Sequence, residues 1–237
     1  MSVLSQVVGG PGMRAAKTVL SRMITRGGWI PDILPQGRLI AGACSRDPAN
    51  TPDVTRLQAG LLMGKITSVV NSLGTVGFYA PSAIGVLNGA LAAGGTTVTL
   101  AAAVVTELVR RQGASGTFKL TGPPTAAGVV VTETVTYSSA ATTIIVCTAT
   151  VNAFVAGSFI QPTDGSETPL AFIGEGYGLP MLEFDGTVAA AVQFPEIPLD
   201  AVVVSSELVN WPSDTSLRAW IVNRLCDVGA GKYIFDH

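Results

Sequence analysis

Apolar and polar positions along the chain follow the pattern of short β-strands separated by turns. Two apolar runs, residues 57–67 and 77–87, flank residues 68–75, in which Asn, Ser and Gly favour a turn. This arrangement predicts a β-hairpin. Pro81 has no backbone N–H to donate, so we expect the second run to lie at a sheet edge or at a strand end.

A second group of strand patterns lies between residues 116 and 172. In residues 129–137, Val135 and Tyr137 share one face with other odd-numbered positions, and threonines dominate the opposite face. The run 142–150 is continuous and β-branched, which is typical of a strand buried on both faces. Several short strands at this spacing predict a small β-sandwich or barrel. Further strands are expected at 37–43, 154–161, 182–184, 188–194 and 201–204.

Two segments have the periodicity of helices. Residues 13–25 place apolar side chains on one arc and basic side chains on another. Residues 215–226 predict a short closing helix capped by Ser213 or Asp214, followed by a tail at 233–237. The glycine cluster at 174–178 predicts a tight turn, because it lacks the spacing and the Lys-Ser/Thr ending of phosphate-binding loops.

The amino-acid composition indicates a protein that assembles with partners, not a free domain. Charged residues make up 13% of the 237 residues and hydrophobic residues 48%, whereas ordinary soluble domains carry about 25% charged residues. A free monomer normally covers itself with charge, so much of this surface is expected to be hidden against partners.

Charge and cysteine content narrow the function classes further. The net charge of -2 argues against a protein that grips nucleic acid across its surface. The three cysteines are widely spaced and form no Cys-x-x-Cys pair, so we interpret them as buried or incidental thiols in a reducing compartment. Residues 66–106 carry no charge but are broken by glycines, Pro81 and asparagines, so no membrane span is expected. No secretory signal is expected either, because the N-terminus lacks a continuous apolar run of adequate length.

The sequence suggests no catalytic, cofactor or metal site. A Ser-His-acid arrangement needs a histidine in a pocket, and the single histidine is the terminal His237. Carboxylates for a glycosidase-like pair could come from Glu175, Glu183 and Asp185, but acids beside a glycine are more typical of a turn. Asp164 and Glu167 lack the dense Asp/Asn spacing of a calcium loop.

The hairpin segment also carries a resemblance to a known family. It reads Leu-x-x-Gly-x-x-Met-Gly-Lys-Ile-Thr, then Gly-Phe-Tyr-Ala-Pro, then Ile-Gly-Val-Leu. This order resembles the core of tailed-phage head decoration proteins. Phe78 stands where a lysine is common in that family, which removes a charge. The matching positions are Leu57, Gly60, Met63, Gly64, Lys65, Ile66, Thr67, Gly77, Tyr79, Pro81, Gly85, Val86 and Leu87.

The resemblance implies a mainly β fold with a decoration-protein-like β-rich core, formed by residues 37–95 and 174–237. Residues 96–173 would be an inserted β-sandwich or barrel module, because compact members of the family lack it. Residues 1–36 would form an N-terminal arm and linker, and a short C-terminal helix would complete the chain. The implied function is that of a structural virion protein, made in the host cytoplasm, that binds the outside of an expanded capsid and stabilises it. Its partners would be the major capsid protein and further copies of itself in a homotrimer, without direct contact to nucleic acid or membrane.

Charge segregation and strand-edge geometry suggest where the capsid or subunit contacts would form. The arm carries four basic residues and no acidic residue before Asp32, which suits an acidic partner surface, although a solvated helix face is the simpler interpretation. An exposed sheet edge near Pro81 is the second expected contact. The four basic residues are Arg14, Lys17, Arg22 and Arg26.

Two alternatives to a decoration protein remain open at this level. One is another structural virion component, of the tail or the connector. The other belongs to a different class, a β-sandwich that binds or hydrolyses a glycan with Glu183 and Asp185 as its acids.

Overall fold

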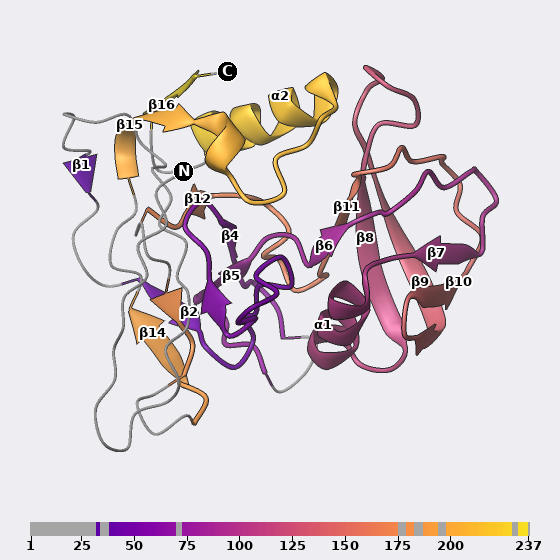
Figure 1. The fold of residues 1–237 in the computed structure, drawn as a ribbon, viewed down its shortest axis with the longest axis horizontal. Helices are drawn as coiled ribbons and strands as arrows, with labels where there is room; N and C mark the ends of the chain where they lie inside the picture. The colour runs from indigo at the N-terminus through magenta and orange to yellow at the C-terminus, as the bar shows by residue number, and fades with distance from the viewer. Residues whose placement is uncertain are drawn as a thin grey trace.

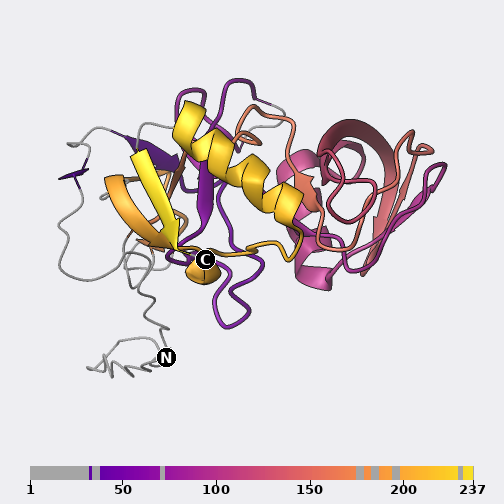
Figure 2. The same ribbon diagram turned by 90° about the horizontal axis from the view of Figure 1, so that it is seen from above.

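Two curled β-sheets lie side by side, and one helix lies across the top of the pair (Figures 1 and 2). The computed structural model describes residues 32–33, 38–69, 73–174, 179–182, 187–193, 198–228 and 232–236. The helix expected at 13–25 lies outside these residues, as does all of the glycine cluster at 174–178 except Gly174. Within the described part the fold is mainly β, which confirms the predicted fold class.

The predicted hairpin forms the centre of the first sheet. Met63 pairs with Pro81 and Lys65 with Tyr79 in an antiparallel ladder. This sheet has five strands in the order β12-β4-β5-β2-β14. The strands are β2 (Leu39–Ala41), β4 (Leu62–Lys65), β5 (Tyr79–Pro81), β12 (Ala171–Phe172) and β14 (Ala191–Gln193).

The structure corrects the expectation of an exposed edge near Pro81. Pro81 does end its strand, as its missing N–H requires, but β5 lies between β4 and β2 and its three residues are buried. A partner therefore has no free sheet edge to bind at this position.

Glycine at position 64 is required by a close backbone approach. A Cβ at Gly64 would lie 1.9 Å from the carbonyl oxygen of Ser166 and 2.5 Å from that of Thr168. Any side chain would push the hairpin away from this loop. The glycine of the family-like pattern thus has a packing reason in this chain.

The second sheet has six strands in the order β6-β11-β8-β9-β10-β7. Its longest ladder runs antiparallel between β8 and β9, from Gly116 opposite Tyr137 to Gly122 opposite Val131. The strands are β6 (Gly85–Val86), β7 (Thr97–Thr99), β8 (Gly116–Gly122), β9 (Val131–Ala141), β10 (Ile144–Cys147) and β11 (Phe159–Gln161).

Side chains alternate across this sheet as its period of two requires. In β9, Val135 and Tyr137 are buried and Thr132, Thr134 and Thr136 are exposed, as expected. The expectation is wrong at the start of the run, because Val129 is 83% exposed and lies before the strand begins at Val131. The expectation for 142–150 is wrong: β10 is buried on one face only, and Ile144 and Val146 are 41% and 43% exposed.

A helix that the sequence analysis did not predict covers the buried face of the six-stranded sheet. Helix α1 (Ala102–Gln112) packs Val104, Val105 and Leu108 against side chains of β8, β9 and β10. Its apolar residues have the 3.6-residue spacing of an amphipathic helix.

The closing helix α2 (Thr215–Asn223) is confirmed, with Asp214 as its N-cap. A π turn (Arg224–Val228) follows it. The expected tail at 233–237 instead forms β16 (Lys232–Asp236), which pairs in parallel with β15 (Pro198–Val204). β1 (Asp32–Ile33) pairs with the other side of β15, which makes a three-stranded sheet in the order β1-β15-β16. β3 (Arg56–Leu57) pairs with β13 (Leu179–Pro180), and a 3-10 helix (Ser205–Glu207) follows β15.

A shared apolar cluster beneath α2 holds the two sheets together. Leu62 of β4 and Phe159 of β11 meet Leu217 and Ile221 of α2 in this cluster, which we call the α2 cluster. Two strands also lie across the predicted domain boundaries. β6, expected in the core, pairs with β11 of the six-stranded sheet, and β12, expected in the module, pairs with β4.

Candidate functional site

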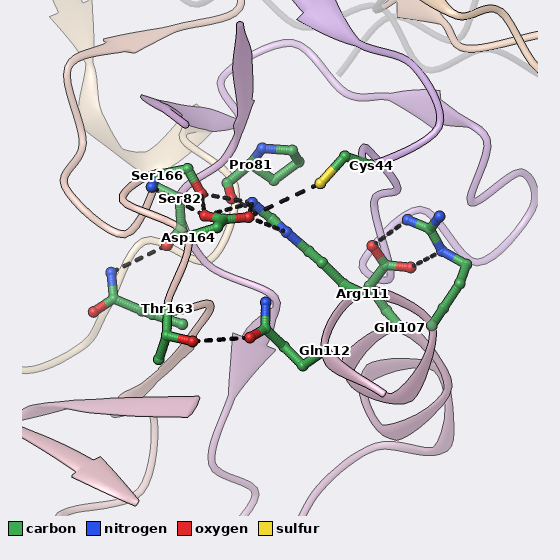
Figure 3. Close-up of polar contacts among 11 residues, drawn as sticks. Cys44, Pro81, Ser82, Glu107, Arg111, Gln112, Thr163, Asp164 and Ser166 are labelled. Carbon is green, nitrogen blue, oxygen red and sulfur yellow. Dashed lines mark hydrogen bonds and ion pairs between the residues drawn. The ribbon is translucent and has the colours of Figure 1, made fainter. Parts of the chain in front are cut away.

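The polar centre of the described structure is a buried ion pair between α1 and the loop after β11 (Figure 3). Arg111 lies in the last turn of α1, and its Nη2 donates to Asp164 Oδ2 at 3.0 Å. The two side chains are only 1% and 6% exposed. A charged pair this deep is stable only if further hydrogen bonds satisfy both groups.

Those further hydrogen bonds involve two segments of the chain, the end of β5 and the loop that carries Asp164. Arg111 Nη1 donates to the carbonyl oxygen of Pro81 at 2.8 Å, and Nη2 donates to Ser166 Oγ at 2.5 Å. Ser166 donates to Asp164 Oδ1 through its backbone N–H at 3.1 Å and its hydroxyl at 2.6 Å. The pair therefore ties the end of β5, in the first sheet, to α1 and the loop beside the second sheet.

A thiol lies at the border of this cluster. Cys44 Sγ is 4.0 Å from Asp164 Oδ2 and is buried. Burial raises the pKa of the Cys44 thiol, and the nearby Arg111 cation only partly opposes that rise. The thiol is thus kept protonated, which is the opposite of what a nucleophilic cysteine needs.

We call the cluster of Arg111, Asp164, Ser166 and Pro81 the junction. Two more ion pairs involve residues next to it in the sequence or on the neighbouring strand. Glu107 accepts from Arg110 Nε at 2.6 Å within α1, and Arg110 also donates to the backbone oxygen of Ala43. Lys119 of β8 pairs with Glu167. These contacts use the charges of Glu107, Arg110, Lys119 and Glu167 for cross-links within the described part of the chain.

An open apolar groove lies between the loop after β8 and helix α2. Its volume is about 410 Å³. Ala127 donates its N–H to Asp214 Oδ2 at 2.9 Å and so fixes the loop to the start of α2. Val129 is 83% exposed at its rim. The lining residues are Ala127, Gly128, Val129, Val130, Ser216, Ala219, Trp220 and Asn223.

Most of the candidate contact, catalytic and metal-binding residues named from the sequence lie outside the described residues. Among them are the four basic residues of the arm, Arg14, Lys17, Arg22 and Arg26, whose contact role stays a prediction. The acids Glu175, Glu183 and Asp185 and the terminal His237 also lie outside.

The two other acids considered for a metal site, Asp164 and Glu167, form the ion pairs with Arg111 and Lys119 instead. In the described ranges, no three His, Cys, Asp or Glu side chains gather as a metal site would require. Among the same residues, no helix has the length and apolar character needed to cross a bilayer.

Sequence reasoning missed the residues at the junction, although a signal was present. Glu107, Arg110 and Arg111 are the first charges after Lys65 in a long uncharged stretch. Charges that interrupt such a stretch are candidates for buried, paired positions. Arg111 pairs with Asp164, which is 53 residues away, and no local pattern connects the two.

Comparison with known proteins identifies no relative of this chain. No protein-family model matches the chain, no curated protein matches it, and no solved structure matches it.

Proposed function

We propose that this chain is a structural virion protein of the head decoration type, which binds the outside of an expanded phage capsid as an oligomer and stabilises it. The observation that carries the proposal is the shortage of charge, 13% of residues against about 25% in ordinary soluble domains. A surface this poor in charge is typical of a protein that is covered by copies of itself and by a shell.

The use of the available charges supports the same proposal. Only five charged residues occur between Lys65 and Asp164, namely Glu107, Arg110, Arg111, Lys119 and Glu133. The first four form ion pairs within the chain. Glu133 accepts the backbone N–H groups of Val151 and Asn152 at 2.7 and 2.9 Å. Little charge is left over for solubility in this stretch of the chain.

The resemblance of the hairpin segment to decoration proteins is the second support. Its residues form a hairpin that lies at the centre of a sheet and requires glycine at position 64. The stabilisation would be mechanical. Apolar and backbone contacts that span neighbouring capsid subunits favour the expanded shell by mass action, and so help it to resist the pressure of packaged DNA.

Binding to heads tests the proposal. Purified protein is sedimented with expanded, DNA-free heads of a tailed phage whose genome encodes this chain, and with unexpanded heads as the control. We expect saturable binding to expanded heads only, and a higher temperature of head disruption when the protein is bound. Equal binding to both head forms, or to neither, would refute a decoration role.

A further inference from the structure

The sequence contains a single Asn-Gly pair, Asn88 and Gly89, in the connection between β6 and β7. Both residues of the pair and the alanine that follows them are exposed. The Asn88 backbone N–H donates to the carbonyl oxygen of Thr99 at 3.3 Å, and Leu91 exchanges two backbone hydrogen bonds with Phe154 at 2.8 and 2.7 Å. The pair therefore lies in a short exposed segment between two fixed points of the backbone.

The described part of the chain does not restrain the two groups that can react in this pair. The side-chain amide of Asn88 and the backbone N–H of Gly89 make no hydrogen bond to any described residue. A Cβ at Gly89 would meet no atom within 4 Å beyond its chain neighbours. The side-chain amides of Asn50 and Asn152 differ, because they donate to a backbone oxygen and to Glu133 Oε2 at 2.8 and 3.0 Å.

From these features we infer that Asn88 is a site of spontaneous deamidation through a succinimide ring. The backbone nitrogen of Gly89 attacks the side-chain carbonyl carbon of Asn88 and forms a C–N bond. Its proton passes to the departing amide group, which leaves as ammonia. Water then opens the ring at either of its two carbonyl carbons and gives aspartate or isoaspartate at position 88. Glycine favours ring closure because it has no Cβ that crowds the attacking nitrogen.

A second pair with the same potential, Asp164 and Gly165, shows how the fold can prevent the reaction. An Asp-Gly pair can close the same ring by losing water in place of ammonia. The side chain of Asp164 is only 6% exposed, and Arg111 and Ser166 hold its carboxylate. Its carboxyl carbon is thus not free to approach the next backbone nitrogen, whereas the side chain of Asn88 has neither restraint.

The products would add charge to a stretch of the chain that has none. Residues 66–106 contain no charged residue, and both products carry a carboxylate that is ionised at neutral pH. Isoaspartate also adds one methylene to the backbone, for which the exposed segment between Asn88 and Leu91 has room. The negative charge therefore accumulates with the age of the folded protein. This inference does not depend on the proposed function.

The test is mass spectrometry of the native full chain after incubation at neutral pH. The peptide that contains Asn88 should gain about 1 Da, because an NH2 group is replaced by OH, and should separate into aspartate and isoaspartate forms. Gly89→Ala, for which the structure has room, should slow the reaction by about 10-fold or more, which corresponds to about 1.4 kcal/mol or more in the barrier. Asn152 is the internal control and should keep its amide over the same period.

An unchanged mass at position 88 would overturn the inference. Deamidation that appears only after unfolding in urea would also overturn it, since the fold would then protect the site. Aspartate without isoaspartate would exclude the ring, because direct hydrolysis gives aspartate alone. Asn88→Gln is a second variant at an exposed position, in case Gly89→Ala does not fold. It keeps an amide but requires a larger ring, so a rate equal to that of the wild type would contradict the succinimide route.

Discussion

Asp164 provides a polar connection between the two sheets, in addition to the apolar α2 cluster. Its carboxylate accepts from Arg111 and Ser166, and through Arg111 it reaches the end of β5. Removing one partner of a buried ion pair leaves the other charge without compensation, which costs far more than the pair itself contributes.

We therefore expect Asp164→Asn to lower the free energy of unfolding by about 3–5 kcal/mol. The change keeps the shape of the side chain and removes the charge that faces Arg111. Urea unfolding followed by circular dichroism measures the loss. The control is Glu167→Gln, whose partly exposed pair with Lys119 should contribute below about 1 kcal/mol. Similar losses in the two variants would contradict the central role of Asp164.

At the scale of elements, Asp214 joins helix α2 to the loop after β8. Its Oδ1 accepts from the backbone N–H groups of Ser216 and Leu217, and its Oδ2 from that of Ala127. Desolvation raises the pKa of Asp214, but these three N–H donors outweigh it and hold the pKa below its usual value. The ionised form is thus the one that stabilises the folded state.

Asp214→Ala should lower the free energy of unfolding by about 1 kcal/mol at neutral pH, the usual cost of losing an N-cap. The sign of its pH dependence follows from the lowered pKa. The wild type keeps this contribution above the unfolded pKa of the carboxyl and loses it as pH falls through the folded pKa. Thermal unfolding from pH 7 down to pH 3 should therefore show the two curves converge in acid.

Ser213→Ala is the matched control for this prediction, since Ser213 is the exposed neighbour of the cap. Its unfolding temperature should follow that of the wild type at every pH. A difference between Asp214→Ala and the wild type that stays constant down to pH 3 would rule out the ionised cap as its cause.

The elements also show what the sequence could predict. The hairpin, β9 and α2 were predicted because each has a clear period, a turn or a cap within a few residues. Helix α1 was missed because Val104, Val105 and Thr106 are β-branched and suit a strand locally, whereas packing against the sheet selects the helix. β16 was missed because its partner β15 lies about 30 residues away in the sequence.

The candidate surfaces were predictable only in part. The shortage of charge indicated hidden surface, but not where it lies. Which side chains of β10 are exposed depends on strand register, since a shift by one residue would bury Ile144 and Val146 and expose Ile145. The junction depends on a contact between Arg111 and Asp164 that no local pattern encodes.

At the scale of the whole molecule, the α2 cluster makes the two sheets one cooperative unit. Leu217→Ala, at a fully buried position in that cluster, should cost about 2–5 kcal/mol. Because the cluster touches both sheets, amide hydrogen exchange should accelerate in β4–β5 and in β8–β9 together. Val151→Ala, at a valine that is 80% exposed, should change neither. Acceleration confined to one sheet would show that the sheets open independently.

The order of strands in the five-stranded sheet has a consequence for synthesis on the ribosome. β2 lies between β5 and β14, and Ile40 pairs with Val192. At translation rates of about 5–20 residues per second, the outer side of β2 waits roughly 8–30 s for that partner to be made. During this interval the unpaired backbone of β2 is exposed to other nascent chains that are being made on the same mRNA. Chaperones that bind nascent chains should therefore raise the yield of the folded protein.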